Sequence, residues 1–136
     1  MTNARGVVLA AAAALMIPLP LFAHHGGTAY DTGKEVILKA TVKEWVYSNP
    51  HTLLLLEVAG ENGQVTQWVA EGQAPNVIFP SGYRRDSFKP GDMVRITVEP
   101  AKNGRPVGRI LQAVLANGKT LGRAASPSPA GGAPQP

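Results

Sequence analysis

The chain has 136 residues, with 13 lysines and arginines against 9 aspartates and glutamates, 3 histidines and no cysteine. That length suits a single domain, and the formal net charge of +4 is spread too thinly to indicate a nucleic-acid partner. The absence of cysteine excludes disulfides, thiolate metal sites, iron–sulfur clusters and a cysteine nucleophile.

Residues 1–23 have the order of a secretory signal peptide. Arg5 precedes an apolar run that ends in Leu-Phe-Ala at residues 21–23, and Pro18 and Pro20 interrupt this run. The run is also short for a helix that spans a membrane. We therefore expect export to the periplasm, cleavage after Ala23 and no membrane span in the mature chain.

The other end of the chain also differs from a folded domain. Residues 124–136 read AASPSPAGGAPQP and carry neither a charge nor a large apolar side chain. Such a segment cannot bury enough apolar surface to offset the entropy that it would lose on ordering. We predict a disordered tail there and a folded domain over residues 24–123.

Within the domain, the apolar residues predict strands. From Val36 to Val42 they occupy every second position, which is the period of a half-buried strand, and a change of phase near Glu44 predicts a bulge. Asn-Gly and Pro-Gly pairs supply turns between the apolar runs. The predicted strands are residues 35–47, 52–58, 65–71, 93–98 and 107–115, with a short extension to residue 121.

Residues 73–82 lack this alternation. Pro75 suits the first turn of a helix, and Pro80 ends any such helix within about a turn and a half. Five strands with one short helix between the third and the fourth predict an all-β fold, a small five-stranded OB-like Greek-key barrel. An open sandwich of five or six strands is the alternative.

The histidines are the strongest candidates for a metal site. After cleavage behind Ala23, His24 would be the first residue, and its α-amine and ring Nδ1 could chelate one metal ion. An imidazole from His51 would complete a set of three nitrogens, and His25 could add a further ligand. Amine and imidazole nitrogens suit Cu(II), Ni(II) and Zn(II), and we expect copper. Met93 would be the only methionine of the mature chain, which excludes a Met-rich Cu(I) carrier.

His51 stands directly after Asn49-Pro50, where the proline restricts its own backbone and that of the residue before it. A stiff turn is a good platform for a ligand, because less entropy is lost on binding. The further residues that could join the site are Asn49, Tyr30, Asp31, Glu71 and Trp68.

A function of another class needs no metal. The protein would then be a ligand-binding or adaptor barrel that uses the face near Trp68, where Arg84 and Arg85 could contact an anion. An enzyme would need the metal as its catalytic centre, since no serine has a nucleophile-elbow context and no two carboxylates are paired. The residues therefore favour a binding protein over an enzyme.

Several stretches taken together resemble DUF family 6152, a family of exported bacterial proteins of unknown function. They are residues 23–25, 40–45 (ATVKEW), 49–51 (NPH), Trp68, Glu71, residues 75–76 (PN), 89–92 (KPGD) and 117–119 (NGK). This chain has Gly26 and Ala40 where members of that family more often have Ser and Gly. The resemblance implies a small exported β-barrel and brings no established activity.

Overall fold

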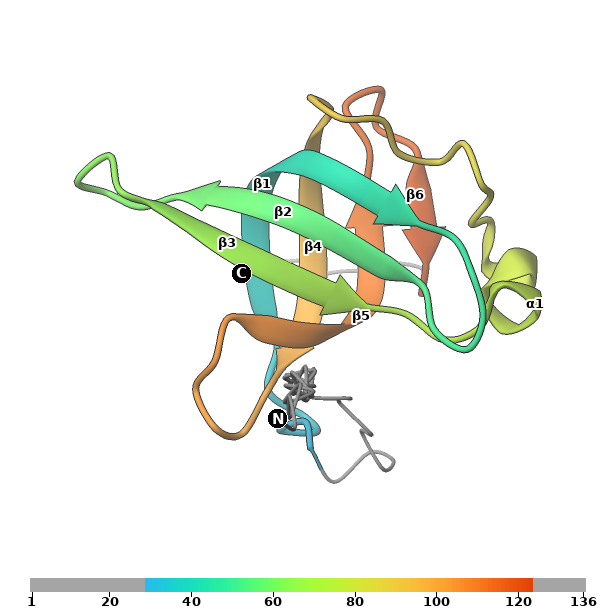
Figure 1. Ribbon diagram of the computed structural model, residues 1–136, viewed down its shortest axis with the longest axis horizontal. Helices are drawn as coiled ribbons and strands as arrows, with labels where there is room; N and C mark the ends of the chain where they lie inside the picture. Colours follow the sequence, from blue (N-terminus) through green and yellow to red (C-terminus); the bar gives the residue numbers. More distant parts are fainter. Residues whose placement is uncertain (1–28, 124–136) are drawn as a thin grey trace, which may run out of the picture.

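The computed structural model describes residues 29–123 (Figure 1). The expected signal peptide, His24, His25 and the expected tail lie outside these residues. The described chain forms the strands β1 (Val36–Val46), β2 (Leu53–Ala59), β3 (Val65–Glu71), β4 (Met93–Pro100), β5 (Val107–Val114) and β6 (Thr120–Gly122). Between β3 and β4 it forms the short helix α1 (Pro75–Ile78) and the 3-10 turn η2 (Phe79–Ser81).

The strands close into a barrel. They hydrogen-bond in the order β3-β2-β1-β4-β5-β6, and a parallel pairing of β3 with β5 joins the two sides of the sheet. All other strand pairs are antiparallel. In Figure 1, β2 and β3 cross in front of β4, and α1 lies at one end of the molecule. The predicted OB-like barrel with one short helix is confirmed, and the open sandwich is wrong because the sheet is closed.

The alternating residues of the strands form the core. Leu38, Ala40 and Val42 of β1 are buried, and their exposed neighbours along the strand face the solvent. The register of β1 against β2 shifts between Val42 and Glu44, so the predicted bulge is confirmed. The bulge changes the phase of the strand, and Trp45 therefore packs against the core as Val42 does.

The short helix begins and ends as its prolines require. Pro75 occupies the first turn of α1, and Pro80 lies in η2, so the helical segment ends at Ser81. Ile78 packs against the core. Among the described residues, no helix is long and apolar enough to cross a membrane.

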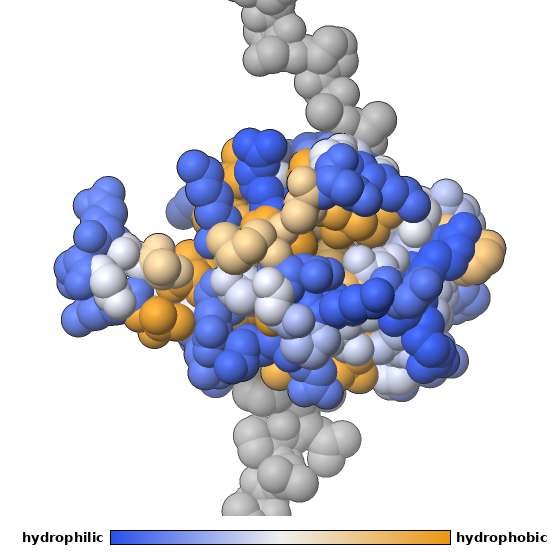
Figure 2. Space-filling view, turned by 90° about the horizontal axis from the view of Figure 1, so that it is seen from above, coloured by the Kyte–Doolittle hydropathy of each residue, from blue (hydrophilic) through white to orange (hydrophobic). Residues whose placement is uncertain are grey.

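The surface of the barrel is mixed in polarity. Figure 2 shows, on the face seen from above, apolar surfaces that hydrophilic side chains separate from one another. The large apolar residues with the highest exposure are Ile37, Val65, Val77, Phe79 and Met93, and they come from different elements of the fold.

Candidate functional site

A cavity of about 700 Å³ lies on the outside of the barrel, beside β2 and β3. Residues of the loop between β1 and β2 and of the loop between β4 and β5 line it. This is the surface on which OB-folds bind oligonucleotides and oligosaccharides. The residues that line it are Ala29, Tyr30, Val46, Ser48, Asn49, Pro50, His51, Leu53, Val69, Glu71, Ala101, Lys102, Asn103, Arg105 and Val107.

His51 and Glu71 meet in this cavity. Nδ1 of His51 lies 3.2 Å from Oε1 of Glu71, and the two side chains are 49% and 13% exposed. Asn49 and Pro50, which lead to His51, are joined by a cis peptide bond and also line the cavity. Because Glu71 occupies the Nδ1 side of the ring, Nε2 is the nitrogen that His51 can offer to a metal ion or to another ligand.

Tyr30 is the third member of this cluster. Its hydroxyl donates a short hydrogen bond to Oε2 of Glu71, and its side chain is buried. Burial raises the pKa of Tyr30, and the hydrogen bond and negative charge of Glu71 raise it further, against an opposing effect of Arg109. The phenol therefore stays protonated and remains a hydrogen-bond donor to Glu71.

The segment that carries Tyr30 is held to the barrel through its backbone. The amide of Asp31 donates to the carbonyl of Pro100 at 2.9 Å, and the amide of Lys102 donates to the carbonyl of Ala29 at 3.0 Å. Tyr30 also forms an isolated bridge with Ala101. The first described residues, Ala29 and Tyr30, therefore lie against the β4–β5 loop at the cavity.

An ion pair lies behind Tyr30. Nε of Arg109 donates to Oε2 of Glu99 at 2.8 Å, and the guanidinium carbon lies 5.7 Å from the centre of the Tyr30 ring. The amide of Gly33 donates to the other oxygen of Glu99 at 3.4 Å. Glu99 is buried, so the pair stabilises both its charge and the position of the segment that precedes β1.

The described residues alone do not make a metal site. Between residues 29 and 123, no three histidine, aspartate or glutamate side chains are grouped so that they could hold a metal ion. In the described part of the chain, the ion-pair partner of His51 is Glu71. Further nitrogen ligands would have to come from His24 and His25, which lie outside the described residues.

The other residues predicted for the site lie in different places. Asp31 follows Tyr30 but does not line the cavity, and Trp68 packs against the core on the inner face of β3, opposite Leu56. Arg84 donates to the carbonyls of Phe79 and Tyr83 and stacks over the Phe79 ring, with its guanidinium carbon 3.6 Å from the ring centre.

The guanidinium of Arg85 lies 5.6 Å from the centre of the Tyr47 ring. Neither Arg84 nor Arg85 lines the cavity that holds His51. Arg84 lines a separate cavity of about 420 Å³ beside Asp86 and Lys89. The structure thus brings Asn49, His51, Glu71 and Tyr30 together, and it places the arginine pair elsewhere.

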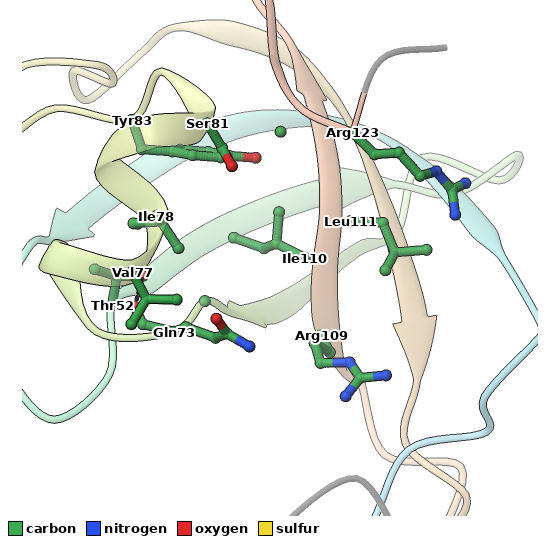
Figure 3. Close-up of a pocket in the computed structure, with 12 residues that line it drawn as sticks. Thr52, Gln73, Val77, Ile78, Ser81, Tyr83, Arg109, Ile110, Leu111 and Arg123 are labelled. Atoms are coloured by element: carbon green, nitrogen blue, oxygen red, sulfur yellow. Dashed lines mark hydrogen bonds between the residues drawn. The ribbon is translucent and has the colours of Figure 1, made fainter. Parts of the chain in front are cut away.

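A smaller cavity of about 300 Å³ lies between α1 and β5 (Figure 3). The side chains of Arg109 and Arg123 lie on the side of this cavity away from α1. Both guanidinium groups are in ion pairs, with Glu99 and Glu35 respectively. Their charges are therefore already compensated, and none of the residues predicted as metal ligands lines this cavity.

Two parts of the main cavity were not predicted from the sequence. One part is the loop between β4 and β5, which supplies Lys102 and Arg105. The other is the outward face of β2, β3 and β5, which supplies Leu53, Val69 and Val107. The predicted OB-like topology could have indicated this loop, because that fold uses it for binding.

The described residues form a small OB-like β-barrel with a cavity on its outer face. The profile of a family of unknown function, DUF6152, matches residues 12–110, and the chain belongs to this family. The match includes all residues that line the main cavity. A search of curated proteins and a search of solved structures found no significant match.

Proposed function

We propose that this protein is exported to the periplasm and there binds a divalent transition metal, with copper as the expected ion, through His24, His25 and His51. The observation that carries the proposal is the contact of His51 with Glu71. Metal-binding histidines commonly use their second ring nitrogen to contact a carboxylate, which fixes the orientation and the tautomer of the ring. Nδ1 of His51 already contacts a carboxylate, that of Glu71.

The position of the first described residues supports the same proposal. Ala29 and Tyr30 line the cavity that holds His51. His24 precedes Ala29 by five residues, so a fully extended chain would place it at most about 18 Å from Ala29. Cleavage after Ala23 would therefore leave the α-amine of His24 within reach of Nε2 of His51.

The donor set fits copper. The α-amine and ring of His24 together with Nε2 of His51 make three nitrogen donors, which Cu(II) binds more strongly than the other divalent ions of the first row. Protons compete with a metal for these nitrogens, so affinity should fall as the solution is acidified. Tyr30 and Glu71 would not need to touch the metal, because they hold the His51 ring from behind.

The proposal is tested on the full mature chain, residues 24–136, by competitive titration with Cu(II). The native chain is compared with a variant that has one extra Met before His24, which moves the free amine and leaves each side chain unchanged. His51→Ala is the second variant. We expect both to bind Cu(II) much more weakly than the native chain.

Equal affinity of the native chain and both variants would overturn the metal site. Export and cleavage are tested separately, by the intact mass of the protein isolated from a periplasm. A mass that includes residues 1–23 would overturn the free amine of His24, and with it the chelate.

A further inference from the structure

Most of the main cavity is not used by the proposed metal site. Leu53 of β2, Val69 of β3 and Val107 of β5 line it and are half-buried. Val69 and Val107 are direct partners in the parallel pairing of β3 with β5. These side chains therefore form a continuous apolar floor on the outside of the barrel, on the same face as Glu71.

The apolar floor is aliphatic. Among the residues that line the cavity, Tyr30 is the only one with a benzenoid ring, and its side chain is buried with its hydroxyl bound to Glu71. Proteins that hold bases on an OB-like face stack them on exposed aromatic rings. Branched aliphatic side chains instead suit a flexible hydrocarbon chain, because they bury it without requiring a planar group.

The segments of the expected mature chain that lie outside the described residues offer few apolar side chains. Residues 24–28 read HHGGT, and residues 124–136 have only alanine and proline as apolar residues. Neither segment contains a valine, leucine or isoleucine. The cavity of about 700 Å³ is large enough for a separate molecule, since ligand pockets typically have about 300–1,000 Å³.

The charges at the rim favour an anion. Lys102 and Arg105 are exposed in the loop between β4 and β5, and both line the cavity. The carboxylate of Glu71 is already contacted by Tyr30 and His51. The rim of the cavity is thus positive on the side of Lys102, and an anionic group is attracted there.

We propose that this cavity binds an amphipathic organic anion, with its hydrocarbon chain on Leu53, Val69 and Val107 and its carboxylate beside Lys102. The ligand is a single-chain aliphatic carboxylate of medium length. The inference goes beyond the proposed metal site, because none of these residues is a proposed metal ligand and the binding needs no metal.

The test uses the full mature chain without metal and measures the binding of octanoate, decanoate and dodecanoate by isothermal titration calorimetry. We expect the affinity to rise roughly fourfold for each added methylene until the chain fills the cavity. Decanol and decyltrimethylammonium serve as probes with the same chain and a neutral or a positive head. Both should bind more weakly than decanoate.

Two variants locate the binding. Val69→Thr keeps the branched shape of the side chain and should weaken decanoate and decanol alike. Lys102→Glu should weaken decanoate by roughly fivefold and leave decanol unchanged. Lys119→Glu changes the same charge in the exposed turn before β6, away from the cavity, and should have no effect.

Failure to bind decanoate, or equal binding of the three head groups, would overturn the inference. So would equal decanoate affinity of the native chain, Val69→Thr and Lys102→Glu. The variant with an extra Met before His24 separates the two proposals, because it should lose Cu(II) and keep decanoate. A native chain that binds Cu(II) but no decanoate contradicts only the inference made here.

Discussion

Glu71, at the end of β3, contacts His51 through one carboxylate oxygen and Tyr30 through the other. His51 belongs to the loop between β1 and β2, and Tyr30 precedes β1. One carboxylate therefore links three segments that are distant in the sequence and fixes the orientation of an imidazole that is half exposed. This is the arrangement by which proteins hold a metal-binding histidine from behind.

Glu71→Gln should weaken Cu(II) binding by roughly 10–100-fold if Glu71 orients His51 as proposed. The amide keeps the shape of the side chain but removes the negative charge that attracts the Nδ1–H of His51. The measurement is competitive titration of the mature chain with Cu(II). Glu57→Gln is the control, because Glu57 lies on β2, pairs with Lys43 at 3.0 Å and does not line the cavity.

Equal Cu(II) affinity of the native chain and Glu71→Gln would show that the carboxylate does not orient a metal ligand. A loss of affinity in Glu57→Gln of the same size would show that net charge alone is responsible. Only a loss confined to Glu71→Gln supports the proposed role.

The protein should lose stability in alkaline solution. Burial raises the pKa of both Tyr30 and Tyr83 above the ordinary value of 10.0, and the hydrogen bond to Glu71 adds to the effect at Tyr30. The unfolded chain therefore releases these protons at lower pH than the folded protein does. The stabilisation is complete below about pH 10 and decreases as the pH rises above it, by about 1.4 kcal/mol per pH unit for each tyrosine.

Tyr83→Phe tests this dependence most directly, because the Tyr83 hydroxyl makes a long hydrogen bond of 3.4 Å, to the carbonyl of Leu121, and no other hydrogen bond within residues 29–123. The variant should resemble the native protein near neutral pH. Above about pH 10 the free energy of unfolding of the variant should decrease less steeply with pH than that of the native protein. The difference in slope corresponds to the one proton that Tyr83 no longer releases. Urea unfolding at several pH values measures both slopes, and identical slopes would contradict the role of Tyr83.

The barrel could be predicted from the sequence because its strands obey local rules. The alternation from Val36 to Val42 gives the buried face of β1, and β3 was predicted with its observed bounds of Val65 and Glu71. Pro75 and Pro80 limit the helix through their own backbone restrictions. None of these predictions required knowledge of which strands lie side by side.

The site could be predicted only in part, because its contacts depend on closure of the barrel. His51 and Glu71 were named from residue type, but the register that brings them together belongs to the pairing of β2 with β3. Contact of Tyr30 with Glu71 also requires the segment before β1 to pack beside the β4–β5 loop. The arginine pair was predicted as an anion contact, yet local geometry directs Arg84 to the carbonyls of its own loop.

Glu99→Gln should destabilise the protein by about 1–3 kcal/mol. Glu99 is buried and accepts hydrogen bonds from Arg109, so removing its charge leaves a partly buried guanidinium without its counter-ion. Glu57→Gln breaks the more exposed pair with Lys43 and should cost at most about 1 kcal/mol. Urea unfolding measures both, and equal losses would contradict the structural importance of the Arg109 pair.

Gly108→Ala should destabilise the protein by about 2–3 kcal/mol, because β5 is flanked at this residue by both β3 and β4. A Cβ at Gly108 would lie 2.7 Å from Cβ of Val98 and 3.1 Å from the carbonyl oxygen of Glu99, so the two strands would have to move apart. Gly60→Ala is the matched control, since its nearest contact would be 3.4 Å and its effect should stay within about 0.5 kcal/mol. The shift in the urea midpoint measures both variants. Equal midpoints of the two variants would contradict the prediction. They would show that the contact of residue 108 with Val98 leaves room for a methyl group.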